Sequence, residues 1–147
     1  MQRPTPCVGI CSTTYGDLVC RGCKRFAHEI VEWNGYATDQ KNAIWLRLRS
    51  LRDSVTEDLL QVTDAVRFDN ALKELRFTGS DDSSSGKAFE LLRRLAARGL
   101  APSGAGLKLV GYSDDRDGIQ QLLVDVDREF YTRSRAYYER SFKIASL

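Results

Sequence analysis

The spacing of four cysteines constrains this chain more than any other feature. Cys7, Cys11, Cys20 and Cys23 follow the pattern C-x3-C-x8-C-x2-C, and the rest of the chain contains no cysteine. Two close pairs joined by a loop of eight residues can bind one metal ion or cluster together. In a reducing compartment, such a group indicates metal ligation rather than disulfide bonds. The sequence therefore predicts that the four thiols are the ligands of one metal site.

The residues around the cysteines support this prediction. Each pair encloses a glycine, Gly9 or Gly22, which allows a tight turn and lets backbone N–H groups face the sulfurs. His28 follows the second pair on an expected helix, and we expect it to be solvated rather than to replace a ligand. The second pair precedes that helix, whose N-terminus stabilises thiolate charge. Basic residues that offset the negative charge of the site are Arg3, Arg21, Lys24 and Arg25.

The identity of the metal stays open between one zinc ion and one iron–sulfur cluster. A tetrahedral four-cysteine zinc site accepts the short spacings within each pair. The common ferredoxin patterns do not match, although other clusters also have four cysteine ligands. In either case four protein ligands leave no open position for a substrate. We therefore expect a site that stabilises the fold or transfers electrons. The sequence singles out no catalytic residue.

The composition sets limits on the partners. With 42% hydrophobic residues the chain can build a core, and a net charge of +2 does not by itself indicate a nucleic-acid partner. No apolar segment is long enough to cross a membrane, and the N-terminus lacks the apolar stretch of a signal peptide. We expect a soluble, cytoplasmic protein without a membrane partner.

Hydrophobic periodicity predicts a mainly α fold, with a small four-cysteine metal knuckle followed by a helical bundle. Residues 1–77 are expected to form the metal-binding module with three helices. The first runs over residues 24–33 and packs through Trp33. The second begins after Thr38 and carries Ile44 and Leu48, and the third begins near Thr56 and runs to about Phe77.

Residues 78–86 are rich in serine, aspartate and glycine, which predicts a flexible linker. Residues 87–147 are expected to form a helical C-terminal region. A short helix there closes at Gly99, and one short strand is compatible with residues 107–112. A last long helix begins at N-cap candidates in residues 114–117.

The motif around the cysteines resembles a known family. The residues that carry the likeness are Pro6, Cys7, Gly9, Cys11, Cys20, Gly22, Cys23, Arg25, Glu29, Ile30 and Trp33. They are similar to the pattern of the bacterial domain of unknown function 1289 family, over about residues 4–53. Its members are commonly labelled predicted iron–sulfur proteins, so the resemblance implies metal binding at the four cysteines. It implies little about activity.

Three functions are compatible with these features, and an enzyme is not favoured. The first is a non-enzymatic, metal-stabilised module that binds a protein partner. The second is an iron–sulfur protein that transfers electrons or senses oxidation. The third is a nucleic-acid-binding accessory protein. It would bind through the basic residues around the cysteines (Arg3, Arg21, Lys24 and Arg25) and through the last helix. That helix alternates aromatic with basic residues, among them Tyr131 and Arg135, but acidic residues dilute its charge.

Overall fold

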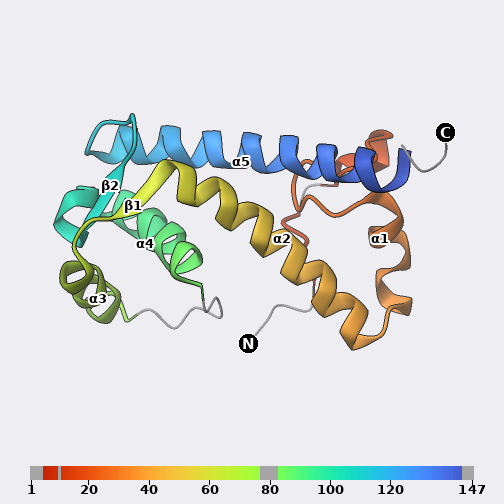
Figure 1. Cartoon of the computed structure of the whole chain (residues 1–147), viewed down its shortest axis with the longest axis horizontal. Coiled ribbons are helices and arrows are strands. Elements are labelled where there is room, and N and C mark those ends of the chain that lie inside the picture. The colour runs from red at the N-terminus through yellow and green to blue at the C-terminus, as the bar shows by residue number, and fades with distance from the viewer. Residues whose placement is uncertain (1–4, 10, 77–82, 144–147) are drawn as a thin grey trace. The chain divides into compact units, whose positions relative to one another are not determined.

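The computed structural model describes residues 5–9, 11–76 and 83–143, and it is mainly helical, as predicted (Figure 1). Two short strands, β1 (Leu60–Val62) and β2 (Leu107–Leu109), accompany the helices. The helices are α1 (Ala27–Glu32), α2 (Thr38–Leu59), α3 (Ala65–Glu74), α4 (Ser84–Arg98) and α5 (Arg116–Tyr138). The shorter turns are the 3-10 helices η1 (Ser12–Tyr15), η2 (Trp33–Gly35) and η3 (Pro102–Ala105), and the π-helical turn η4 (Glu139–Lys143).

The chain forms two compact units. Residues 53–127 make up one, the strand unit, and residues 2–52 with 128–147 make up the other, the cysteine unit. The boundary therefore falls inside α2 and inside α5. This grouping differs from the regions 1–77 and 87–147 that the composition indicates, because a polar segment marks a break in apolar pattern and not which segments pack together.

In the strand unit, the prediction of a third helix from Thr56 to Phe77 is wrong. Helix α2 continues to Leu59, the chain then forms β1, and α3 begins only at Ala65. The Asp64 side chain caps α3 by accepting hydrogen bonds from the backbone N–H groups of the next turn. The spacing of the apolar residues in Leu60–Val62 is compatible with a helix or a strand. These residues form a strand because they pair with β2, which is distant in the sequence. Phe77 itself lies outside the described residues.

The predicted short strand is confirmed, and it has the partner that the sequence did not reveal. Strands β1 and β2 pair antiparallel, with Leu60 opposite Leu109 and Val62 opposite Leu107. Gly106 precedes β2 with φ 72°, and a Cβ there would collide with the backbone carbonyl of Asp64. Its own carbonyl accepts a hydrogen bond from the backbone N–H of Thr63 over 2.8 Å. The glycine therefore allows the chain entering α3 to approach the chain entering β2.

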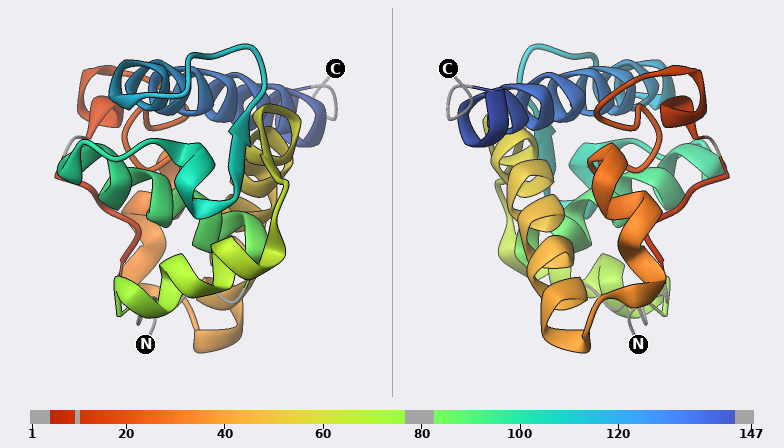
Figure 2. Two further views of the ribbon diagram at one scale, coloured as in Figure 1. Left: turned by 90° about the vertical axis from the view of Figure 1, so that its left-hand side faces the viewer. Right: turned by 90° about the vertical axis from the view of Figure 1, so that its right-hand side faces the viewer.

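The ribbon of this unit faces the viewer in the left view of Figure 2. Buried side chains from its helices and strands form one core. Leu91, Leu92, Ile119 and Leu122 are fully buried. The other buried members are Val55, Leu60, Phe68, Ala88, Phe89, Leu95, Ala96, Ala105, Leu107, Leu109 and Val126. Because α4 supplies the largest share of this apolar surface, it anchors the unit.

Helix α4 corrects part of the predicted linker. Ser83 is its N-cap, and the Ser83 hydroxyl accepts a hydrogen bond from the backbone N–H of Gly86 over 2.9 Å. Residues 83–86, expected in the linker 78–86, are thus the cap and first turn of a helix, because serine is a good N-cap residue. Residues 77–82 lie outside the described residues. The helix ends as predicted, with Gly99 in the left-handed conformation.

In the cysteine unit, Trp33, Ile44 and Leu48 form a small core, flanked by Tyr36, Trp45 and Phe130. The right view of Figure 2 shows the ribbons of α1 and of the first half of α2, which carry most of these residues. The predicted packing of Trp33 against the first half of α2 is confirmed. Trp33 opens the 3-10 turn η2 that ends α1, so the indole lies where the chain turns from α1 to α2.

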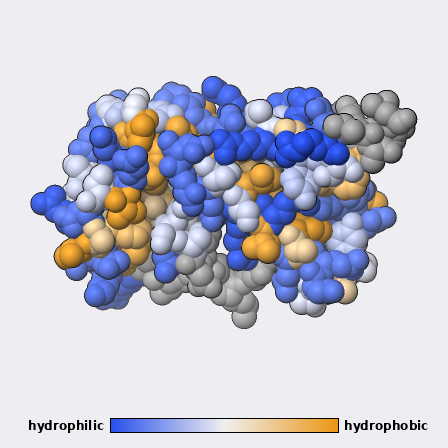
Figure 3. All heavy atoms as spheres, viewed as in Figure 1, coloured by the Kyte–Doolittle hydropathy of each residue, from blue (hydrophilic) through white to orange (hydrophobic). Residues whose placement is uncertain are grey.

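Within the described residues, no helix combines the length and apolarity that a membrane span requires. The face drawn in Figure 3 is mostly hydrophilic, with separate apolar groups between the charged ones. Strongly hydrophilic side chains cover the C-terminal half of α5 in this view.

Candidate metal centre

The second cysteine pair lies in a tight turn before α1. The backbone N–H of Cys20 donates to the carbonyl of Arg25 over 2.9 Å, and the N–H of Lys24 donates to the carbonyl of Cys20 over 2.8 Å. Lys24 adopts φ 66°, the left-handed conformation that closes the turn. Its ammonium group is buried and donates to the carbonyl of Gly22 over 3.0 Å. The turn is thus held by its own backbone and by one buried cation.

This turn corrects the predicted start of the first helix. Helix α1 begins at Ala27 and not at Lys24, because residues up to Arg25 are engaged in the turn and Val19 bridges to Phe26. The Glu29 carboxylate accepts a hydrogen bond from the backbone N–H of Phe26 over 2.8 Å. It therefore satisfies a donor that would otherwise lack a partner at the helix start.

The sulfur of Cys20 is surrounded by backbone donors. Burial of the side chain, which is 1% exposed, disfavours the thiolate. Hydrogen bonds from the backbone of Cys23, Ser12 and Gly22 outweigh that burial and lower the pKa of the Cys20 thiol. Backbone N–H groups therefore face the sulfur of Cys20, as expected from the glycine between Cys20 and Cys23.

Arg25 supports the sulfur of Cys23. The Nε of Arg25 donates to Cys23 Sγ over 3.3 Å, and the guanidinium carbon lies 4.9 Å from the centre of the Trp33 ring. Burial raises the pKa of the Cys23 thiol, although the hydrogen bond and the charge of Arg25 act in the opposite direction. Arg25 therefore contacts a sulfur, whereas Glu29, four residues further along the chain, pairs with Arg47.

The first cysteine pair is exposed. The backbone N–H of Gly9, whose φ is 88°, donates to Cys7 Sγ over 3.4 Å, as expected for a glycine turn around a thiolate. Cys11 Sγ lies 3.0 Å from Thr13 Oγ1. Hydrogen bonding by Thr13, and then by Thr14, lowers the pKa of the Cys11 thiol. Both pairs therefore have surroundings that favour the ionised form of at least one thiol.

The structure does not gather the four cysteines into one set of ligands. Across residues 5–9, 11–76 and 83–143, no three histidine, cysteine, aspartate or glutamate side chains are grouped closely enough to hold a metal ion. All four cysteines are free thiols. The donors nevertheless suit a metal–thiolate centre, because each sulfur has a hydrogen-bond partner of the kind that stabilises bound thiolate. The ligand set stays a prediction.

A buried ion pair connects the cysteine turn to α2, and the sequence did not reveal it. Both carboxylate oxygens of Glu29 accept hydrogen bonds from Arg47 over 2.6 Å. The guanidinium carbon of Arg47 also lies 4.0 Å from the centre of the Phe26 ring. Glu29 and Arg47 are mostly buried, with side-chain exposures of 6% and 15%. The sequence signal is weak: an acidic residue in α1 and one of several arginines in α2.

The only histidine belongs to an aromatic cluster. The His28 ring lies 5.9 Å from Phe26 and 5.1 Å from Phe142, and Phe26 also contacts Tyr137 and Tyr138. The aromatic residues on the last helix therefore pack, in part, on the start of α1. Of the four basic residues predicted to offset the charge of the site, Arg25 donates to the sulfur of Cys23 and Lys24 turns inward to Gly22. Arg3 lies outside the described residues.

Comparison with known families supports the resemblance seen in the sequence. The family described as Protein of unknown function (DUF1289) matches residues 5–52, which include all four cysteines, α1 and the first part of α2. The match therefore coincides with the larger segment of the cysteine unit. No curated protein and no solved structure matches the chain.

Proposed function

We propose that residues 5–52 form a metal-dependent module. In it, Cys7, Cys11, Cys20 and Cys23 bind one zinc ion or one iron–sulfur cluster, and the module serves a non-enzymatic interaction with a protein partner. The observation that carries the proposal is that every one of the four sulfurs has a hydrogen-bond partner, from backbone or side chain. Hydrogen bonds of this kind offset thiolate charge and orient the ligands of a metal.

The segment that carries Cys7 and Cys11 has few buried contacts with the rest of the module. Cys7 and Cys11 are exposed, and the buried cluster of Trp33, Ile44 and Leu48 includes no residue of this segment. A metal bound by both cysteine pairs would tie this segment to the turn at Cys20 and supply folding energy. Four thiolate ligands leave no open position for a substrate, which is why we propose a structural role and not catalysis.

Metal analysis of the full chain tests the proposal. Protein purified without oxygen should contain either one zinc per chain or iron with acid-labile sulfide, and each single Cys→Ser variant should lose most of that metal. The variant His28→Ala is the matched control, because His28 packs against Phe142 and is not a proposed ligand. Retention of metal and of the melting temperature in all four cysteine variants would refute the site.

The same preparation separates the two forms of the site. A colourless protein with one zinc supports the structural module. A brown protein with iron and sulfide whose absorbance changes reversibly on reduction favours the alternative of a redox or sensing protein.

Exposed apolar side chains on the module are the basis for the protein partner. Val31 on α1 is 84% exposed and Leu46 on α2 is 65% exposed. Cross-linking in cells should give a product with the wild-type chain that Val31→Asp and Leu46→Asp lose without losing metal. Val124→Asp is the matched control, since Val124 is 52% exposed on α5 but belongs to the strand unit. Equal products from all three variants would count against this surface.

A further inference from the structure

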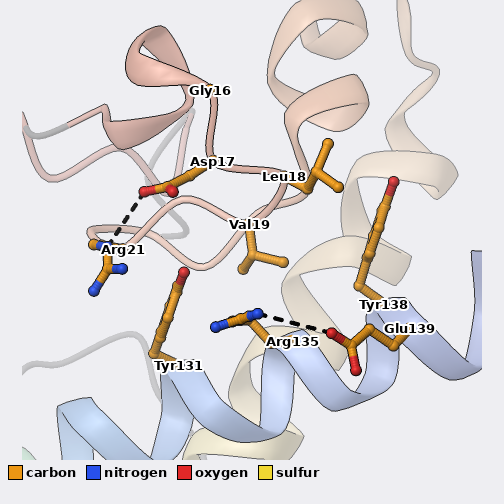
Figure 4. Close-up of a pocket in the computed structure, with 9 residues that line it drawn as sticks. All are labelled: Gly16, Asp17, Leu18, Val19, Arg21, Tyr131, Arg135, Tyr138 and Glu139. Carbon is orange, nitrogen blue, oxygen red and sulfur yellow. Dashed lines mark hydrogen bonds and ion pairs between the residues drawn. The ribbon is translucent and has the colours of Figure 1, made fainter. Parts of the chain in front are cut away.

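A small pocket lies within the cysteine unit, and none of the four cysteines lines it. It has a volume of about 170 Å³ and is lined by residues between 16 and 21, by the C-terminal turns of α5 and by the first residue of η4. Figure 4 shows the side chains that enclose it. Those that matter chemically are Asp17, Arg21, Tyr131, Arg135, Tyr138 and Glu139.

Two arginines on the pocket wall are held in place by neighbours. Arg21 Nε donates to Asp17 Oδ2 over 3.2 Å, and an Arg135 nitrogen lies 3.8 Å from a Glu139 oxygen. Tyr131 adds a contact to each, because the two guanidinium carbons lie 4.8 Å and 5.9 Å from the centre of its ring. The two cations are therefore positioned around one tyrosine before any ligand arrives.

Several donors on the pocket wall remain available. Within the described residues, Arg21 uses one of its side-chain nitrogens in a hydrogen bond, and the contact of Arg135 with Glu139 is longer than a hydrogen bond. The hydroxyl groups of Tyr131 and Tyr138 form no hydrogen bond with another described residue. Guanidinium and phenol groups together present N–H and O–H donors to one small space.

We propose that this pocket binds a phosphate group. A phosphate offers several oxygens to donors that converge from different directions, and guanidinium groups bind such oxygens with charge-assisted hydrogen bonds. Stacking of a nucleobase is the weaker fit, because the Tyr131 ring is already engaged by two guanidinium groups. The pocket suits the phosphate itself, with the rest of a mononucleotide or of a nucleic-acid strand remaining outside it.

Two carboxylates limit the affinity. Asp17 and Glu139 also line the pocket, so the formal charges of its four charged side chains sum to zero. Asp17 engages the Nε of Arg21 and so orients the guanidinium, whereas the looser Glu139 competes with a ligand for Arg135. Removing the charge of Glu139 should therefore strengthen phosphate binding and would weaken binding of a cation.

Calorimetric titration of the full, metal-loaded chain tests the proposal with inorganic phosphate, a nucleoside monophosphate and a short single-stranded RNA as probes. Arg135→Gln should weaken binding about tenfold, the loss expected for one charge-assisted hydrogen bond. Glu139→Gln should tighten it. Arg133→Gln is the matched control, because Arg133 forms the same type of pair with Glu129 on the same helix but does not line the pocket.

The three probes identify the source of the phosphate. Binding of the monophosphate as tight as that of the RNA points to a free nucleotide or phosphate, and much tighter binding of the RNA points to a strand. In both cases affinity should fall as salt rises. Absence of binding by all three probes, an equal loss in Arg133→Gln, or weaker binding in Glu139→Gln would overturn the proposal. Equal metal content in the variants separates this result from a failure of the metal site.

Discussion

The Nε of Arg25 donates a hydrogen bond to Cys23 Sγ over 3.3 Å, and Arg25 is only 4% exposed. Its guanidinium carbon lies 4.9 Å from the centre of the Trp33 ring. A buried cation is thus fixed by an aromatic ring next to a proposed metal ligand. Through these two contacts, Arg25 connects Trp33 in the small core of the cysteine unit to the sulfur of Cys23.

We expect Arg25→Gln to reduce metal affinity about 10- to 100-fold, the usual effect of removing an outer partner of a ligand. Competition with a chelator measures this affinity. Lys41→Gln is the control, because the Lys41 ammonium also lies over Trp33, at 5.6 Å, and has no contact with a sulfur in the described residues. Equal affinity losses in the two variants would show that the aromatic contact, and not the hydrogen bond to sulfur, matters.

The buried pair of Glu29 and Arg47 should be important for stability. Glu29→Gln leaves the Arg47 guanidinium without its counter-ion, and breaking a buried pair in this way costs about 3–5 kcal/mol of the free energy of unfolding. Denaturant unfolding measures the change. The exposed pair of Glu129 and Arg133, at 3.2 Å, is the control, and Glu129→Gln should cost less than about 1 kcal/mol. Similar costs for the two pairs would contradict the burial argument.

Gly106→Ala should destabilise the strand unit more than Gly99→Ala does. Both glycines have positive φ, 72° and 67°, so alanine strains the backbone similarly at either position. A Cβ at Gly106 meets the Asp64 carbonyl, whereas at Gly99 nothing lies within 4 Å. The extra cost at Gly106 should be about 1–3 kcal/mol, as for other overpacked sites. Equal melting temperatures for the two variants would show that the backbone around Asp64 can shift to accommodate the Cβ without loss of stability.

Asp115 should make the stability of the chain depend on acidic pH. A hydrogen bond from the backbone N–H of Gly118, and another from the Ser113 hydroxyl, lower the pKa of the Asp115 carboxyl from its usual 3.8. The stabilisation is therefore complete above the unfolded pKa and is lost as pH falls through the lower folded value. Between about pH 5 and pH 2, the melting temperature of Asp115→Ala should decline less than that of the wild type. Parallel declines would contradict this role.

Local signals predicted several elements well. Gly99 ends α4 in the left-handed conformation because glycine adopts it without a steric penalty. Asp115, one of the predicted N-cap candidates, accepts the N–H of Gly118 in the first turn of α5. Trp33 packs against Ile44 and Leu48 because helical spacing places apolar residues on one face. Each of these features depends on residues close to one another in the chain.

Other features could not be predicted because they depend on the choice of a distant partner. The spacing of apolar residues in Leu60–Val62 is compatible with a helix, and pairing with Leu107–Leu109 makes it a strand. Glu29 has an arginine four residues before it in the sequence, but it pairs with Arg47. The left-handed conformation of Lys24 follows from the hydrogen bonds that close the turn, and its residue type does not indicate it.

The sequence by itself determined the four thiols, the glycines beside them and the mainly helical character, because these follow from residue type and short spacing. The tertiary structure alone decided that Arg25 reaches the sulfur of Cys23 and that Arg21 meets Tyr131 and Arg135 in one pocket. The physical reason is that long side chains from separate segments acquire their partners only when the backbone brings those segments together.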